Sequence, residues 1–462
     1  MTPVEGMQPE AIIAELIVLG GSVIVLVAGL FTARERQWAM AAIGALTLFA
    51  AGIASIAALQ GPERLVFDGT YAVDAAGAYA RAVIAFAALL VVGLSFREVR
   101  GNPRETEFYV LLLFSTLGLM LLTGASDLML LMVAYILSSI PLYTLTAFRK
   151  DAVGTEAAMK YLLMGALLGI AMLYGLAFLY GSGGATAYHE LAPRLTDGVS
   201  GALALGLALA MAGLVFKLGA VPGHFWVPDV TDAAPLSVAA FVTTVPKLAA
   251  LVAAARLLVQ LGPDALLDWR LPLALVAALT MTLGNLAALW QESVRRLLAY
   301  STISQVGYML MAVVVAGRLT LAESALLFYL LAYAAMNLGA FAVVAALGDR
   351  RRLSEYGGLF RQQPALALAL TASLLSLIGI PPLAGFVGKL GVFVLAWDGG
   401  FAWLVVLAAA NTVISMFYYL RWLIPVFLGD GEAPFETVSI AAVVAYVAAV
   451  ATVLFGILGP LV

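Results

Sequence analysis

Long runs of hydrophobic residues recur along the whole chain, separated by short polar segments. Each run has about 20 residues, the length that an α-helix needs to cross a bilayer. The runs are apolar on every face, whereas the strands of a membrane β-barrel would alternate apolar and polar residues. The pattern predicts an all-α polytopic membrane protein with fourteen spans, near residues 11–31, 38–59, 75–96, 108–124, 127–147, 158–180, 199–221, 235–260, 271–290, 298–316, 322–347, 365–395, 401–425 and 437–459.

The composition supports a membrane protein and narrows its chemistry. Of the 462 residues, 63% are hydrophobic and 11% are charged, too few charges to cover the surface of a soluble domain of this size. The chain has no cysteine, which excludes disulfides, iron–sulfur clusters and c-type haem. Its two histidines, His189 and His224, are too far apart to suggest a metal site. We therefore expect no metal and no redox cofactor on this chain.

Basic residues in the loops predict the orientation, because cytoplasmic loops are enriched in Lys and Arg. One set of alternate loops contains 13 of them, and the other set contains four. The first set, which we expect in the cytoplasm, is Arg34, Arg36, Arg97, Arg100, Arg104, Arg149, Lys150, Arg295, Arg296, Arg350, Arg351, Arg352 and Arg361. Both termini then lie on the outer side. The first residues are acidic rather than basic, so we do not expect the first span to be a cleaved signal peptide.

Four of the five lysines fall inside the predicted spans: Lys160, Lys217, Lys247 and Lys389. Arginine stays charged almost anywhere, whereas a buried lysine can gain and lose a proton. Ionisable groups inside a membrane commonly mark pathways for ions or protons. The alternative is that a lysine only extends its amine to the headgroups, which applies best to Lys160 and Lys389, near helix ends or breaks.

Two lysines lie next to predicted helix breaks. Pro222 and Gly223 follow Lys217, and the segment "GIPPLAG" precedes Lys389. A proline in a span frees backbone carbonyls, which are tolerated where they line a hydrated cavity. The breaks are in the seventh and twelfth spans, an offset that reverses topology and is typical of inverted-repeat transporters. In the alternative interpretation, the prolines only shape helix packing.

The offset predicts two inverted five-helix repeats. We expect residues 1–107 to form helices 1–3, residues 108–260 the first repeat with helices 4–8, residues 271–425 the second repeat with helices 9–13, and residues 426–462 the last helix. Pro246 adds a third proline next to a lysine, Lys247, in the eighth span. We expect Lys217, His224 and Lys247 to meet near the middle of the bilayer.

Several motifs at these positions resemble a known family. They are "FKLGAVPGHFWVPDVTDAAPLSVAAFVTTVPK", "EAAMKYLLMGA", "NLAALWQESVRRLLAYSTISQVGYM" and "LSLIGIPPLAGFVGKLGVF". They resemble the antiporter-like membrane subunits of respiratory complex I, the NADH–quinone oxidoreductase, with the best match to the subunit N group and its mitochondrial counterpart, subunit 2. The resemblance covers most of the chain, from residue 108 to about residue 425.

The resemblance implies a fourteen-helix subunit that moves protons while other subunits pass electrons from NADH to quinone. Lys217 matches the central lysine of the family, Lys160 the lysine that modulates it, His224 and Lys247 the connecting pair, and Lys389 the lysine of the exit half. NADH, FMN, the iron–sulfur clusters and the quinone are then expected on partner subunits. The partners implied are antiporter-like paralogues and small membrane subunits, in the cell inner membrane.

The sequence departs from the family at two positions. Ile136 stands where the family has a glutamate on helix five, and Gln305 stands where family members often have a histidine. Three explanations are open for Lys217 without its carboxylate. Tyr135 or Ser138 solvates the amine, a neighbouring subunit supplies the acid, or this half of the chain no longer pumps.

Two other functions remain open at this stage. One is a stand-alone or Mrp-type cation/proton antiporter, and the other is a structural paralogue that does not pump. Among the minor features, we expect Tyr418, Tyr419 and Trp422 to lie at the membrane interface. Glu15 in the first span is expected either to face a partner subunit or to lie near the membrane surface.

Overall fold

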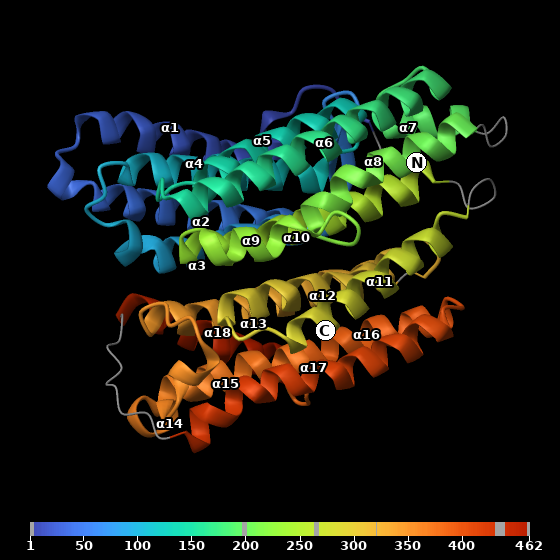
Figure 1. Cartoon of the computed structure of the whole chain (residues 1–462). Helices are drawn as coiled ribbons and strands as arrows, with labels where there is room; N and C mark the ends of the chain where they lie inside the picture. Colours follow the sequence, from blue (N-terminus) through green and yellow to red (C-terminus); the bar gives the residue numbers. More distant parts are fainter. Residues whose placement is uncertain (1–3, 196–200, 263–267, 320, 430–438, 460–462) are drawn as a thin grey trace. The chain divides into compact units, whose positions relative to one another are not determined.

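The computed structural model describes residues 4–195, 201–262, 268–319, 321–429 and 439–459, and Figure 1 follows the chain by colour. The first part contains α1 (Ile13–Phe31), α2 (Trp38–Ala57), α3 (Ala75–Val99), α4 (Glu105–Gly124), α5 (Leu128–Thr146), α6 (Ala152–Gly183), α7 (Tyr188–Leu191), α8 (Gly201–Leu218) and α9 (Trp226–Ala233). The second part contains α10 (Leu236–Leu261), α11 (Arg270–Leu289), α12 (Val294–Val314), α13 (Ala322–Ala346), α14 (Leu359–Gln362), α15 (Pro364–Ile378), α16 (Ala384–Asp398), α17 (Ala402–Leu428) and α18 (Ser439–Leu458).

The predicted membrane spans are confirmed. Within the described ranges, 13 helices are long and apolar enough to cross a membrane. The remaining predicted span, the twelfth, is divided into α15 and α16, each of 15 residues. One feature outside the all-helical prediction is an antiparallel hairpin between α2 and α3, formed by β1 (Arg64–Val66) and β2 (Tyr71–Val73). Short 3-10 helices cover Pro9–Ile12, Arg34–Arg36, Ala58–Gln60, Ala192–Leu195 and Leu353–Tyr356.

The chain divides into two compact units. Unit 1 comprises Met1–Leu89, Arg100–Trp226 and Val245–Leu273. Within it, α6 packs along α8, α4 packs against α5, and α1 lies against both α2 and α4. The approach of α6 to α8 is close because Gly175 has no side chain, and a Cβ there would lie 2.3 Å from the Ala210 nitrogen.

Unit 2 comprises Leu90–Val99, Val227–Thr244 and Ala274–Val462. Here α13 packs against α12, α15, α16 and α18, and α12 also contacts α16. The helices α12 and α13 are almost wholly buried, and both carry polar side chains inside the unit. A buried polar side chain needs a hydrogen-bond partner, so these helices are where a polar network is expected.

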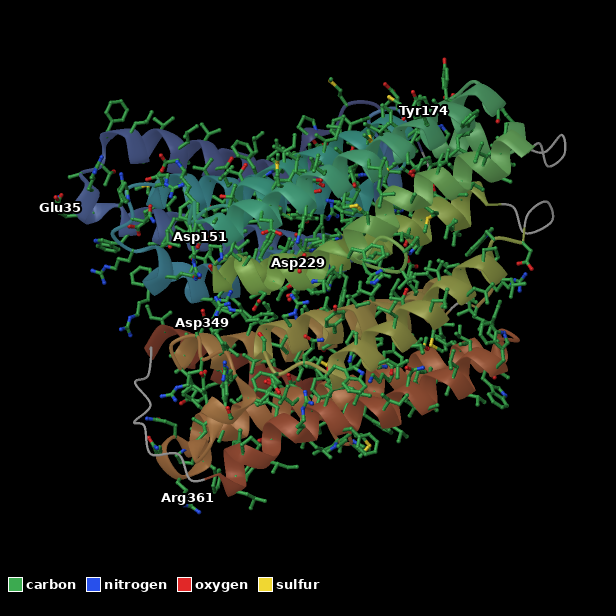
Figure 2. All side chains as sticks on the ribbon, viewed as in Figure 1. Glu35, Asp151, Tyr174, Asp229, Asp349 and Arg361 are labelled. Atoms are coloured by element: carbon green, nitrogen blue, oxygen red, sulfur yellow. The ribbon has the colours of Figure 1, made fainter. Side chains whose placement is uncertain are left out.

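Side chains that face away from the helix bundle are largely apolar. On α6, Tyr174 is 63% exposed and projects outward in Figure 2, and Leu163 and Leu167 are exposed on the same helix. Glu35 lies in the short turn between α1 and α2. An apolar lateral surface with charges in the turns is what lipid or other membrane subunits require.

Local sequence fixes where several helices begin. Asp127 caps α5 by accepting hydrogen bonds from the Met129 and Leu130 amides, and Asp151 caps α6 by accepting one from Gly154. Such caps satisfy amides that have no partner within their own helix. Both aspartates thereby define the start of helices that contribute to the candidate site.

The breaks predicted in the seventh and twelfth spans are confirmed. α8 ends at Leu218 and is followed by Gly219 with φ of +69°, and α15 ends at Ile378 and is followed by Gly379 with φ of +96°. Glycine adopts this left-handed conformation without a steric penalty, which makes it the usual residue after a helix end. Pro222 and Pro382 each come three residues after the glycine, and both follow cis peptide bonds.

Candidate functional site

Lys217 lies in the last turn of α8, directly before the first break, and its side chain is buried. Its Nζ donates to Ser138 Oγ and Ser139 Oγ, both at 2.7 Å, and lies 3.4 Å from the Tyr135 carbonyl oxygen. The amine also lies 4.6 Å from the centroid of the Tyr135 ring, a cation–π distance. One face of α5 therefore provides every partner that the structure gives to this amine.

The two serine hydroxyls that contact Lys217 can both donate and accept hydrogen bonds. Ser138 Oγ and Ser139 Oγ each donate to the Tyr135 carbonyl, at 2.9 and 2.7 Å, while accepting from the lysine. A hydroxyl can donate or accept by rotating its O–H bond. The pair can therefore hydrogen-bond either the ammonium or the neutral amine without moving the backbone.

Ile136 does not belong to this contact face. Its side chain is 40% exposed, whereas Tyr135, Ser138 and Ser139 are buried. Residues three and four apart share a helix face, which groups Tyr135 with the two serines and leaves Ile136 beside them. The expectation that position 136 faces the seventh span is wrong for this side chain. Sequence reasoning identified Tyr135 and Ser138 as alternatives to the missing carboxylate, and it missed Ser139.

Lys247 lies on α10, directly after Pro246, and is completely buried. Its Nζ is 3.5 Å from the main-chain oxygen of Lys217 and 4.7 Å from the centroid of the Trp226 ring. The expectation that Lys217 and Lys247 lie together therefore agrees with the geometry. Their link passes through the last turn of α8.

His224 lies in the same break but is not hydrogen-bonded to either lysine in the described part of the chain. Its ring packs against Phe225 at a tilt of 32°, with 4.3 Å between centroids. The side chain is buried, and Nδ1 has no hydrogen-bond partner among the residues that the structure describes. The break therefore holds one unsatisfied imidazole nitrogen close in sequence to Lys217.

Lys160 lies apart from this cluster. Its side chain is 49% exposed on α6, and its Nζ lies 2.9 Å from Glu156 Oε1, one turn earlier on the same helix. The family resemblance implies that Lys160 modulates Lys217, but the structure does not bring the two side chains together.

Lys389 lies on α16, after the second break, and is buried. Its Nζ donates to the carbonyl oxygens of Leu377 and Ile378, both at 2.9 Å, and lies 4.3 Å from the centroid of the Tyr308 ring. These two carbonyls end α15, where the last turn of a helix has no intrahelical donors and carries partial negative charge. The break itself thus creates the binding site for the amine.

Gln305 on α12 joins this second lysine to a wider network. Its Nε2 donates to the Leu377 carbonyl at 2.8 Å, the same oxygen that accepts from Lys389, and Tyr329 donates to its Oε1 at 2.7 Å. Gln305 stands where the family often has a histidine, and it also combines a donor with an acceptor. The chain of contacts therefore runs from Lys389 through one carbonyl to Gln305 and Tyr329.

Further polar side chains are buried between α11, α12 and α17. Asn285 Nδ2 donates to Tyr308 Oη and to Asn411 Oδ1, both at 3.1 Å, and Tyr418 donates to Asn285 Oδ1 at 3.0 Å. The ring of Tyr308 is the one that lies under Lys389.

The predicted interfacial belt is wrong. Tyr418, Tyr419 and Trp422 are completely buried, and Tyr418 and Tyr419 are joined to the polar side chains of Asn285 and Ser301. Aromatic residues near Arg421 suggested an interface position, but α17 turns these three rings toward the interior of unit 2. Within the described ranges, no three His, Asp or Glu side chains are grouped to hold a metal ion.

Comparison with known proteins gives consistent matches. Residues 125–415 match the family model described as NADH:quinone oxidoreductase/Mrp antiporter, transmembrane. NADH-quinone oxidoreductase subunit N 1 of Streptomyces griseus is 49% identical over 453 residues, covering 97% of this chain and 96% of the relative.

Two solved structures share the fold. A chain of respiratory complex I from Thermus thermophilus with bound aureothin matches with a TM-score of 0.84 and 35% identity, over 97% of this chain and 98% of that chain. A chain of the Mrp complex from Dietzia has a TM-score of 0.86 but 23% identity, over 98% and 96%, which is a likeness of fold alone. The chain belongs to the NADH:quinone oxidoreductase/Mrp antiporter family of membrane subunits, and within it to the subunit N group.

Proposed function

We propose that this chain translocates protons through a relay of Lys217, Lys247 and Lys389, with His224 in the first break, as a membrane subunit of a complex I-type NADH–quinone oxidoreductase. The observation that carries the proposal is the surroundings of Lys217 and Lys389. Each amine is buried beside a broken helix, and all of its hydrogen-bond partners are neutral oxygens. No carboxylate forms an ion pair with either amine within the described ranges.

A buried amine without a fixed counter-charge is suited to proton transfer. A permanent ion pair holds the proton on the lysine, whereas neutral hydroxyls and carbonyls accept hydrogen bonds without adding a negative charge. Lys217 exchanges its proton within the hydroxyl pair of α5, and Lys247 takes part from the other side of the last turn of α8. Lys389 performs the same role at the end of α15. Lys160 is assigned only a modulating role, because it is exposed and paired with Glu156.

The two inverted repeats, residues 108–260 and 271–425, are also a proposal, supported by matching glycine contacts. A Cβ at Gly118 would meet the Ser138 nitrogen at 2.5 Å, and a Cβ at Gly284 would meet the Ser304 nitrogen at 2.6 Å. Both members of the second pair lie 166 positions after those of the first. The close crossing of α4 with α5 thus recurs in α11 with α12.

The offset of 166 positions also pairs Ser139 with Gln305, the residues of α5 and α12 that reach the broken helices. The breaks follow a shorter offset, because Gly219 and Gly379 lie 160 positions apart, which pairs Lys217 with Leu377. We infer that both halves use one arrangement, in which a polar side chain of the second repeat helix contacts the helix end before a break.

The electron-transfer groups belong elsewhere in this proposal. NADH, FMN, iron–sulfur clusters and quinone are assigned to partner subunits, and this chain itself is proposed to carry no cofactor. Its partners are other antiporter-like and small membrane subunits. The excess of basic residues on one set of loops supports an inner-membrane location with both termini on the outer side.

An Mrp-type antiporter is the main alternative function. The fold does not separate the two, because the Mrp chain matches it as well as the complex I chain does. Sequence identity favours the oxidoreductase, at 49% to subunit N of Streptomyces griseus and 23% to the Mrp chain.

The experiment measures protons pumped per NADH oxidised by the assembled complex in vesicles. Lys247→Ala or Lys389→Ala is expected to lower this yield at least several-fold without preventing assembly. Lys150→Ala is the matched control, because Lys150 is the one lysine outside the predicted spans and is exposed. An unchanged proton yield in both test variants would refute the relay.

A further inference from the structure

A second group of charged residues lies in unit 1, with Glu15, Arg81 and Asp127 buried and with Asp74 and Arg256 partly buried. It contains three carboxylates, Glu15, Asp74 and Asp127, and two guanidinium groups, Arg81 and Arg256. They come from α1, the start of α3, α3 itself, the start of α5 and the end of α10. The loops that contribute to the group are those predicted to lie on the outer side of the membrane.

Two of the carboxylates are paired with arginines. Arg81 Nη1 lies 3.1 Å from Glu15 Oε1, and the Tyr71 hydroxyl hydrogen-bonds both side chains. Glu15 is therefore an internal ion-pair partner, and the prediction that it faces a partner subunit is wrong, whereas a position near the membrane surface stays a prediction. Asp74 accepts two hydrogen bonds from Arg256, at 2.7 and 3.0 Å.

These pairs and Asp127 share one electrostatic environment. Burial raises the pKa of Asp74, but the ion pair with Arg256, the hydrogen bond from the Gly77 amide and the charge of Arg81 lower it. Together these three interactions outweigh burial, so the pKa of Asp74 lies below its usual value. Burial raises the pKa of Tyr188 well above its usual range, and the nearby Asp127 carboxylate adds to this, while Arg256 opposes it. Arg256 thus lowers the pKa of both Asp74 and Tyr188, and the Asp127 carboxylate raises the pKa of Tyr188.

Asp127 is the carboxylate without a cation. Its Oδ1 accepts hydrogen bonds from the Met129 and Leu130 amides, at 2.7 and 2.9 Å. Its Oδ2 is buried without a hydrogen-bond partner among the described residues, and the Asp127 side chain forms no ion pair there. Arg81 and Arg256 are engaged by Glu15 and Asp74.

The segment paired with that of Asp127 contains Tyr188, whose hydroxyl also lacks a hydrogen-bond partner in the described part of the chain. Tyr188 is 1% exposed. Backbone contacts hold the two segments together: Asp127 forms a β-bridge with Ala187, and the Tyr188 amide donates to the Ser126 carbonyl at 2.9 Å. A buried acceptor and a buried donor thus lie on two paired segments, and ordered water commonly satisfies such groups.

The charges of the group do not cancel. Arginine remains protonated in proteins, so the two guanidinium groups balance only two of the three carboxylates. A buried polar oxygen without a hydrogen-bond partner is costly, and Oδ2 of Asp127 is such an oxygen. Asp127 is also the carboxylate of this group that has no ion pair with either arginine in the described part of the chain.

We propose that Asp127, together with Tyr188, is a proton-release site at the outer end of unit 1. Asp127 Oδ2 binds one proton and gives it up to the outer solvent through water that the Tyr188 hydroxyl orients. The carboxylate that remains keeps the hydrogen bonds from the Met129 and Leu130 amides to Oδ1. The direction of release rests on the proposed function and its orientation, but binding of a proton at Asp127 does not.

Asp127→Asn separates this role from helix capping. An asparagine keeps the Oδ1 acceptor that caps α5 and replaces only the unpartnered oxygen, and Asn caps helices as well as Asp does. Asp151→Asn is the matched control, because Asp151 caps α6 in the same way but is exposed. Tyr188→Phe removes the hydroxyl and leaves the carboxyl and the cap unchanged.

The test is an infrared difference spectrum of the intact complex between the resting state and NADH-driven turnover. We expect a carboxyl C=O band that shifts in D₂O, is lost in Asp127→Asn, changes frequency in Tyr188→Phe and is unchanged in Asp151→Asn. Persistence of the band in an Asp127→Asn complex that still oxidises NADH would overturn the proposal, as would an unchanged frequency in Tyr188→Phe.

The proton yield distinguishes this proposal from the lysine relay. If the band depends on Asp127 while the lysine variants pump normally, the relay fails and the release site stands. If the lysine variants stop pumping while the band persists in Asp127→Asn, the release site fails and the relay stands.

Discussion

The two broken helices hold their lysines in different ways. Lys217 precedes its break and donates to two serine hydroxyls of another helix, α5. Lys389 follows its break and donates to two carbonyls at the end of α15, the other half of its own broken helix. Both amines lie over a tyrosine ring at similar distances, 4.6 and 4.3 Å.

This difference determines what each site can do. Carbonyl oxygens only accept hydrogen bonds, and a helix end favours a positive charge, so the carbonyls at Lys389 always require the amine to donate. Hydroxyls can donate as well as accept, so the serines at Lys217 adapt to either protonation state. A proton at Lys389 therefore needs another group to receive it, while Gln305 shares the Leu377 carbonyl with Lys389 and can only influence the strength of that contact.

The largest expected effect is from removing both hydroxyls at Lys217. The double variant Ser138→Ala, Ser139→Ala leaves the buried amine with one carbonyl at 3.4 Å. Each lost hydrogen bond to a charged group is worth about 1.5–3 kcal/mol. We expect proton pumping in vesicles to fall at least tenfold, while Ser182→Ala, at a partly exposed serine on α6, serves as the control. Normal pumping by the double variant would contradict the role of the hydroxyls.

A carboxylate in place of one serine at Lys217 should also stop proton transfer in the first half of the chain. Ser139→Asp would put a fixed negative charge where a neutral oxygen now lies 2.7 Å from Lys217 Nζ, so the proton would be held in an ion pair. Ile136→Glu is expected to have a much smaller effect, because position 136 is 40% exposed and lies beside the contact face. Comparison of proton yields tests this, and a larger loss in Ile136→Glu would reverse the assignment of the contact face.

In the second half, Gln305→Leu is expected to reduce pumping only a few-fold. The substitution removes the link between the Leu377 carbonyl and Tyr329 but leaves both carbonyl partners of Lys389 in place. Gln305→His should restore most of the activity, because a histidine also combines a donor with an acceptor. If the leucine variant pumps normally, the contact of Gln305 with the Leu377 carbonyl does not matter for proton transfer at Lys389.

The smallest expected effect on pumping is at an ion pair that does not belong to the relay. Asp74→Asn should lower the thermal stability of the complex, since breaking a partly buried pair with Arg256 costs about 1–3 kcal/mol, below the full cost for a completely buried pair. The folded-state pKa of Asp74 is lowered, so the wild-type stabilisation is present above the unfolded pKa and is lost as the pH falls below about 4. Melting curves at several pH values should show a smaller loss in the variant, and equal pH dependence would contradict the pairing.

Sequence patterns predicted the spans and the breaks because their causes are local. Uniform hydrophobicity, the proline after Gly219 and the "GIPPLAG" segment each act within a few residues. The surroundings of the lysines depend on contacts between distant segments. The carbonyls that hold Lys389 belong to Leu377 and Ile378, and a main-chain contact leaves no signature in residue type.

The sequence patterns also did not predict how each helix is rotated about its axis, or which distant segments pair with each other. Ser139 and Ile136 are close in sequence, but only the packing of α5 decides that Ser139 contacts Lys217. Asp127 forms a β-bridge with Ala187, and the two segments lie far apart in the chain. Span length and composition carry no information about either arrangement.

The most direct test of the central claim is the proton yield of the complex with Lys217→Arg. Arginine keeps the positive charge and can donate to both serines, but it does not release a proton in proteins. The account predicts an assembled complex that oxidises NADH, with a proton yield as low as that of Lys217→Ala. A wild-type proton yield from the arginine variant would show that no proton leaves position 217 during turnover.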